Sequence, residues 1–139
     1  MNYAEWNIEI AKKSYADFQK GDIASIIAVS DENVQWSTPG DLTLDAAGTR
    51  HGKAGVQEFF QAVNEIWEFE SFEPLEYVAQ GDTVVALGRY AVRSRKTGRR
   101  TSSDWVMVWR IRNGKLVEFK EYTDTLALYR ALAAEPAAA

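Results

Sequence analysis

The sequence predicts an α+β protein, in which helices cover one face of an antiparallel sheet. Apolar residues recur at helical spacing near the N-terminus and again after residue 52, and three strand patterns follow one another between residues 81 and 124. No repeat, linker or charge block divides the chain. We therefore expect residues 1–133 to form a single domain, and residues 134–139, which lack any large apolar side chain, to form a disordered C-terminal tail.

Two helices are predicted in the first part of the chain. Residues 3–20 place apolar side chains on one helical stripe, and Gly21 is expected to end this helix. Asp22 then stands where an N-cap residue is needed, so we expect a short second helix that extends to Ala28.

The middle of the chain is predicted to alternate between strands and one further helix. A strand is expected over Asn33–Ser37, and residues 41–51 have no periodicity and are interpreted as a loop. A third helix is expected to begin at Lys53 and to run to about residue 66. Glu68–Gln80 alternates loosely and contains Pro74, which indicates two strand pieces separated by a kink.

The C-terminal part is predicted to be an antiparallel meander of three strands, Thr83–Arg93, Ser103–Arg112 and Leu116–Thr123. Asn113-Gly114 connects the last two, and Asn-Gly is the preferred pair for a tight hairpin turn with positive φ at both central residues. Asp124 is interpreted as the N-cap of a final short helix.

Composition excludes several kinds of function. The chain has no cysteine and a single histidine, His51, so thiol chemistry and a histidine metal cluster within one chain are excluded, and we expect no metal and no cofactor. The net charge of −4 argues against nucleic acid as a partner. No apolar run approaches the ~20 residues of a membrane helix, so we expect a cytoplasmic protein that has no membrane partner.

Several short segments in this order resemble the SnoaL-like proteins of the nuclear transport factor 2-like superfamily. They are Gly21-Asp22 between two helices, Gly48–Val56 followed by Phe59-Phe60, and Asn113–Thr125 at the end of the meander. Ketosteroid isomerase, polyketide cyclases and limonene epoxide hydrolase are relatives. The resemblance implies a cone-shaped (cystatin-like) fold with a deep, mostly apolar pocket, and a homodimer. It does not fix the reaction, because this fold hosts isomerases, cyclases, dehydratases, hydrolases and binding proteins.

Strand alternation divides the meander into two faces. Val106 and Val108 lie on the face that we expect to meet a second copy of the chain, because this face is too apolar for a fully solvated surface. Matching the hairpin to the relatives makes the other, more aromatic face the wall of the pocket. The meander residues then expected to bind a ligand are Ser103, Trp105, Met107, Trp109, Phe119 and Thr123. Positions transferred from the relatives by the resemblance add Ser14, Gln35 and Ser37.

The catalytic residues of the better-known relatives are missing. The three catalytic positions that the resemblance transfers from ketosteroid isomerase fall on Ser14, Thr38 and about Met107. The arginine and first aspartate of the epoxide hydrolase pattern fall on Gly88 and Tyr90. Neither of these mechanisms is therefore expected in this protein.

Glu121 is the one acid that strand alternation places on the pocket face, and it matches the acid/base carboxylate of the SnoaL cyclases. A carboxyl group in an aromatic pocket has a raised pKa, which suits proton transfer near neutral pH. Tyr90 lies on the same face and would donate a hydrogen bond to a developing enolate. Two alternatives stay open: Glu121 faces outward and pairs with Arg110 or Lys120, or Tyr90 is a core residue.

Two functions follow from this sequence. The first is a cofactor-free isomerase, cyclase or dehydratase that acts on a small, largely apolar or polyketide-like aromatic molecule through Glu121 and Tyr90. The second is a binding or protein-interaction module without chemistry. The roles of four further residues stay open at this point, namely Asp41, Asp45, His51 and Asp104.

Overall fold

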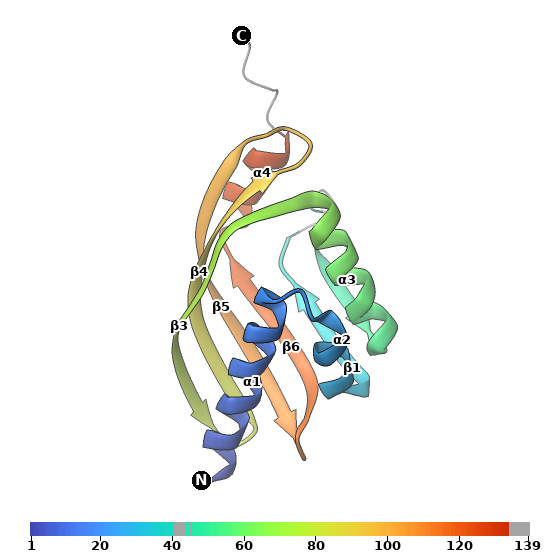
Figure 1. Cartoon of the computed structure of the whole chain (residues 1–139), viewed down its shortest axis with the longest axis vertical. Helices are drawn as coiled ribbons and strands as arrows, with labels where there is room; N and C mark the ends of the chain where they lie inside the picture. Colours follow the sequence, from blue (N-terminus) through green and yellow to red (C-terminus); the bar gives the residue numbers. More distant parts are fainter. Residues whose placement is uncertain (41–43, 45, 134–139) are drawn as a thin grey trace.

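The structure is a computed structural model that describes residues 1–40, 44 and 46–133. Helices and strands follow one another along the chain, with helices concentrated in the first half (Figure 1). They are α1 (Tyr3–Gln19), α2 (Ile23–Val29), β1 (Ser30–Thr38), β2 (Gly48–His51), α3 (Gly52–Ile66), β3 (Trp67–Gln80), β4 (Thr83–Ser94), β5 (Arg100–Arg112), β6 (Lys115–Thr123) and α4 (Thr125–Ala133).

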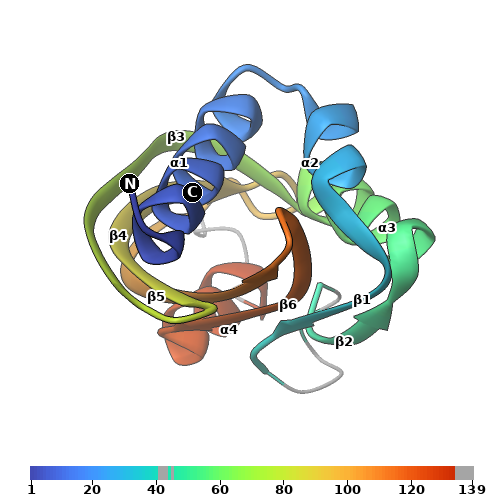
Figure 2. The same ribbon diagram turned by 90° about the horizontal axis from the view of Figure 1, so that it is seen from below.

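The strands form one six-stranded sheet in the order β2-β1-β6-β5-β4-β3. All neighbours are antiparallel except β1 and β6, which run parallel, so the sheet is mixed. Figure 2 shows that the sheet curls, with α1 lying against its inner face, while α2 and α3 stand on the same side near β1. α4 lies beside the β4–β5 hairpin at one end of the molecule (Figure 1). Three helices thus cover the inner face of the curled sheet.

The helix signals in the sequence are confirmed by the cap geometry. Gly21 has a φ of 76°, which ends α1 at little steric cost. The Asp22 carboxylate accepts hydrogen bonds from the backbone N–H and the hydroxyl of Ser25, at 3.1 and 2.6 Å. Asp124 caps α4 in the same way by accepting from the backbone N–H of Ala127 at 3.0 Å. Asn113-Gly114 also forms the expected tight turn, with φ values of 51° and 75°.

Two expectations for the middle of the chain are wrong. Residues 48–51, expected to belong to a loop, form the edge strand β2, which pairs with β1. None of its four residues is buried, so the hydrophobic pattern of the sequence could not reveal it. The expected break at Pro74 is instead a local irregularity within β3, where the pairing with β4 shifts register after Pro74. Because β3 is an edge strand, the missing N–H of Pro74 is tolerated there.

A glycine is required at position 88 of β4 because neighbouring atoms lie too close to its backbone for a side chain to fit. A Cβ atom at this position would lie 2.2 Å from the Trp105 ring and 2.5 Å from the carbonyl oxygen of Glu73. The indole of Trp105 therefore lies flat over the strand, where it stacks on Phe72 with ring centroids 5.2 Å apart. This contact fills the core beneath the β3–β4 side of the sheet.

The outer face of the sheet is partly apolar. Val106 and Val108 are half-buried there, and Tyr122, which pairs with Val106 across the strands, is exposed. The pairing of this face with a second copy of the chain stays a prediction. Within the described residues, no helix is long and apolar enough to cross a membrane.

Candidate functional site: an apolar cavity with one carboxyl group

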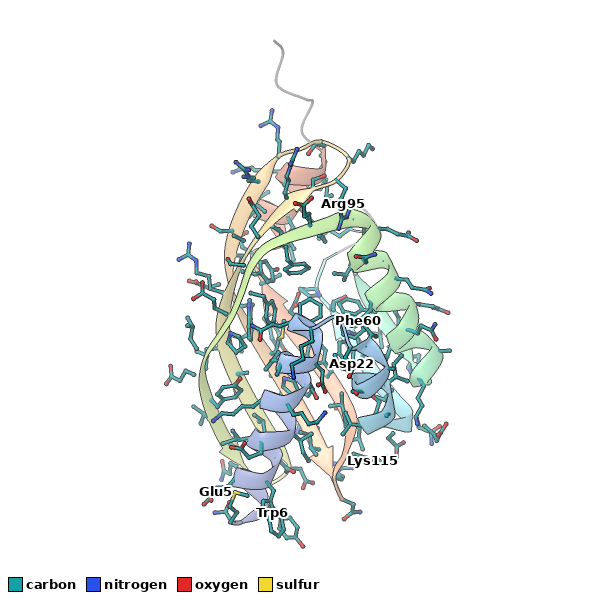
Figure 3. All side chains as sticks on the ribbon, viewed as in Figure 1. Glu5, Trp6, Asp22, Phe60, Arg95 and Lys115 are labelled. Carbon is teal, nitrogen blue, oxygen red and sulfur yellow. The ribbon has the colours of Figure 1, made fainter. Side chains whose placement is uncertain are left out.

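A cavity of about 110 Å³ lies between the inner face of the sheet and the helices. Phe60, labelled in Figure 3, points from α3 into this space. Most of the lining side chains are aromatic or aliphatic. They come from α1 (Tyr15, Phe18), α2 (Ile26), β1 and the following segment (Trp36, Pro39, Leu44, Ala46, Ala47), α3 (Phe59, Phe60, Val63, Ile66), the sheet (Trp67, Phe69, Phe72, Tyr90, Val92, Met107, Trp109, Phe119) and α4 (Leu128, Leu132).

Glu121 lines this cavity from β6, where it pairs across the strands with Met107 of β5. Alternation along β6 sends Phe119 to the same side and Glu118 to the outside. Glu118 makes an ion pair with Arg110 at 3.4 Å on the outer face. The alternative in which Glu121 itself faces outward and pairs with Arg110 or Lys120 is therefore wrong.

The carboxyl group of Glu121 has no hydrogen bond or ion pair with any other described residue. Its side chain keeps some accessible surface because it borders the cavity, but protein surrounds it and water does not solvate it freely. Burial disfavours the charged form and raises the pKa of Glu121 to about 7. Near neutral pH the carboxyl group therefore exists in both protonation states.

The structure brings Tyr90 into the same cavity wall, as expected, but its hydroxyl is already engaged. It shares a 2.8 Å hydrogen bond with the hydroxyl of Thr123. Thr123 in turn lies 2.9 Å from the hydroxyl of Ser103. Burial, and secondarily the nearby Glu121 carboxylate, raise the pKa of Tyr90, so this side chain stays protonated.

The helix side of the cavity contributes two hydroxyl groups from α1, those of Ser14 and Tyr15. The Tyr15 hydroxyl accepts a hydrogen bond from Trp109 Nε1 at 2.7 Å and donates to Met107 Sδ at 3.3 Å. Ser14 is only 3 % exposed, and its hydroxyl makes no hydrogen bond with a described residue. Sequence reasoning missed Tyr15 as a cavity residue, although its place on the buried helical stripe is the signal that could have identified it.

The residues expected to bind a ligand divide into four groups. Met107, Trp109 and Phe119 lie in the cavity wall together with Ser14. Trp105 is buried but packs in the core beside the cavity.

Ser103 and Thr123 form the hydroxyl chain behind Tyr90 and do not line the cavity.

The expectation that Gln35 and Ser37 face the cavity is wrong. Gln35 is exposed, and the Ser37 hydroxyl contacts Thr49 Oγ1 of the edge strand at 2.9 Å. In β1 the alternate residues Trp36 and Thr38 point inward instead, and the Trp36 ring stacks on that of Phe119 at 3.9 Å.

The residues left open by the sequence contribute little to the described cavity. His51 is the N-cap residue of α3, but its side chain makes no capping hydrogen bond. Asp104 is exposed on the outer face, opposite Arg89 on β4. Asp41 and Asp45 lie outside the described residues. In the part of the chain that the structure describes, no group of three His, Cys, Asp or Glu side chains could hold a metal ion.

Comparison with known proteins assigns the fold first and the family second. The fold is that of the NTF2-like proteins. An NTF2-like protein from Burkholderia xenovorans LB400 has a TM-score of 0.84 and 37 % identity, over 93 % of this chain and 97 % of that chain. An NTF2-like protein from Burkholderia pseudomallei K96243 has a TM-score of 0.85 and 29 % identity, over 92 % of this chain and 98 % of that chain. TerC, co-crystallised with polyporic acid, has a TM-score of 0.83 and 32 % identity, also over 92 % of this chain and 98 % of that chain.

The family model of the SnoaL-like domain matches residues 11–119, so this chain belongs to the SnoaL-like family. No curated protein sequence matches it.

Proposed function

We propose that the protein binds a small, largely apolar organic molecule in the cavity and that Glu121 exchanges a proton with it. The observation that carries this proposal is a carboxyl group that has no partner among the described residues, in a wall that is otherwise almost entirely apolar. Burying a polar group without a hydrogen bond costs stability. A ligand that supplies the missing hydrogen bond removes this cost, so the site favours ligands with a polar group beside an apolar body.

The chemistry that suits this arrangement is general acid/base catalysis without a cofactor. A side chain with a pKa near the working pH can both accept and return a proton at a useful rate. Ionised Glu121 would remove a proton from a carbon next to a carbonyl group, and the protonated form would deliver it to another position. Isomerisation, cyclisation and dehydration all include such steps. The similarity to TerC, which was co-crystallised with polyporic acid, supports an organic ligand.

Binding without chemistry is the second candidate, and one observation favours it. An enolate needs a hydrogen-bond donor at its oxygen, but the hydroxyls of Tyr90 and Tyr15 are already engaged with other side chains. Among the described hydroxyl groups of the wall, this leaves only that of Ser14 without a partner. Tyr90 can serve as the expected donor if Thr123 donates the hydrogen bond that the two hydroxyls share, or if that bond is replaced by one to the ligand.

The experiment that tests the proposal follows hydrogen exchange in D₂O by NMR, with cyclohex-2-enone as the probe. The wild type is expected to accelerate deuterium incorporation next to the carbonyl group, with a pH dependence centred near the Glu121 pKa of about 7. Glu121→Gln should abolish the acceleration. Glu118→Gln is the matched control, because it makes the same change on the outer face of the same strand. If the wild type binds the ketone but does not accelerate deuterium incorporation, the catalytic proposal is refuted and binding without chemistry remains as the function.

A further inference from the structure

The volume of the cavity limits the choice of ligand more strictly than the chemical groups of the cavity wall do. Pockets for drug-sized ligands have volumes of about 300–1,000 Å³, whereas this cavity measures about 110 Å³. An engineered apolar cavity of about 150 Å³ holds a single benzene molecule. The space inside this protein is of the same order, so it accommodates no more than one six-membered ring. A fused or biaryl ligand would fit only if the aromatic wall moved apart.

The polar groups of the wall limit the ligand further. Tyr15 and Tyr90 have hydrogen-bond partners within the protein, and the hydroxyl of Thr38 donates to the carbonyl oxygen of Ala46. Trp36 Nε1 has no partner among the described residues, but this atom is enclosed by protein and is not accessible from the cavity.

Among the described residues, two polar groups that face the cavity remain without a partner, the hydroxyl of Ser14 and the carboxyl group of Glu121. A neutral carboxyl or carboxylate can accept from a ligand hydroxyl, and a serine hydroxyl can donate to a carbonyl oxygen.

These two groups belong to different walls of the cavity. Ser14 lies on α1, which packs against β3, β4 and α2, whereas Glu121 lies on β6, between β5 and β1 in the sheet. A ring that carries oxygen atoms at two separate positions can give each of the two groups its own hydrogen bond. A ligand that reaches only one of them leaves the other without a hydrogen bond.

We infer that the cavity takes a single-ring compound with two oxygen groups, a hydroxyl that contacts Glu121 and a carbonyl that contacts Ser14. This inference rests on the proposed function, because it names the class of molecule that the same cavity binds. Ser14 is then a positioning residue: it orients the carbonyl group of the ligand but takes no proton itself.

Isothermal titration calorimetry at pH 6, where the phenolic groups of the probes are protonated, tests the inference with three compounds. They are phenol, 4-hydroxybenzaldehyde and the two-ring analogue 6-hydroxy-2-naphthaldehyde. The wild type should bind 4-hydroxybenzaldehyde about three- to tenfold more tightly than phenol, as expected for one additional hydrogen bond. The naphthaldehyde should bind at least tenfold more weakly than its one-ring counterpart, because it exceeds the cavity.

Ser14→Ala should remove the preference for the aldehyde, and a cooperative urea denaturation transition reports that the variant is folded. Ser37→Ala is the matched control, since Ser37 lies outside the cavity on the other face of β1, and it should keep the preference.

Equal or tighter binding of the two-ring compound would overturn the size limit but leave the proposed function intact. An unchanged preference in Ser14→Ala would overturn the role of Ser14. Failure of all three compounds to bind the wild type at millimolar concentration would overturn the inference and the proposed binding function together.

Discussion

The buried carboxyl group of Glu121 should make the stability of the protein depend on pH between about 4.5 and 7. Burial raises the pKa of Glu121 from its ordinary value of 4.5 to about 7 in the folded state. Between these values the unfolded chain has lost the proton and the folded protein still holds it, so unfolding becomes more favourable as pH rises. Each pH unit corresponds to about 1.4 kcal/mol, so the total loss of unfolding free energy amounts to about 3 kcal/mol by pH 8.

Urea denaturation of the wild type and of Glu121→Gln at half-unit steps from pH 4.5 to pH 8 measures this effect. The variant replaces the carboxyl group by a neutral amide of the same shape, so it should be more stable than the wild type by about 3 kcal/mol at pH 8 relative to the difference at pH 4.5. Glu118→Gln, in the exposed ion pair with Arg110, should follow the wild-type curve. A difference between wild type and Glu121→Gln that stays constant across this range would refute the claim that burial raises this pKa.

Three further predictions concern residues in the strands and the helix cap that surround the site. Gly88→Ala should lower the unfolding free energy by about 1–3 kcal/mol in urea denaturation, because the added Cβ would lie 2.2 Å from the Trp105 ring; unchanged stability would contradict that contact. Asp124→Ala should cost about 1 kcal/mol through loss of the bond to the Ala127 N–H, and amide hydrogen exchange should rise in α4 but not in α1. Val106→Arg should convert a dimer to a monomer in light scattering if the outer sheet face pairs two copies, whereas a wild-type monomer would exclude that pairing.

The sequence predicts the inward residues of β5 and β6 correctly, from a turn signal combined with the match to the relatives. Asn113-Gly114 defines the turn between β5 and β6, and strand alternation puts Phe119 and Glu121 on the same face of β6. A plain count from this turn would place Met107 opposite Lys120, but a register shift further along the hairpin brings it opposite Glu121. The turn therefore fixes which strands pair, whereas the inward face of β6 comes from the match to the relatives.

The error in β1 has the opposite cause. Gln35 and Ser37 were placed in the cavity by counting from a motif of the relatives, and a shift of one residue moves every side chain of a strand to the other face. The local pattern already pointed the other way, because Val34 and Trp36 are the large apolar residues and alternate with polar ones. Where a transferred position conflicts with the apolar alternation of the strand itself, the alternation is the better guide.

Other parts of the wall could not be predicted because they depend on tertiary contacts between distant segments. Leu128 and Leu132 of α4 close the cavity although they follow the sheet in the sequence. They are held there by contacts such as the hydrogen bond from the Thr97 hydroxyl in the β4–β5 turn to the carbonyl oxygen of Ala131, at 2.6 Å. Neither segment carries a local pattern that indicates the other.

The contrast between two acidic side chains argues that Glu121 is kept for function. Asp17 on α1 is also largely buried, at 7 % exposure, but its carboxylate accepts a hydrogen bond from Lys13 at 2.9 Å. Glu121 has no such partner among the described residues and retains its carboxyl group next to a cavity. A buried polar group without a partner costs more than an apolar side chain of the same volume, and no contact of Glu121 within the described protein offsets that cost. A ligand in the cavity would offset it, which makes Glu121 the residue whose substitution separates folding from function most clearly.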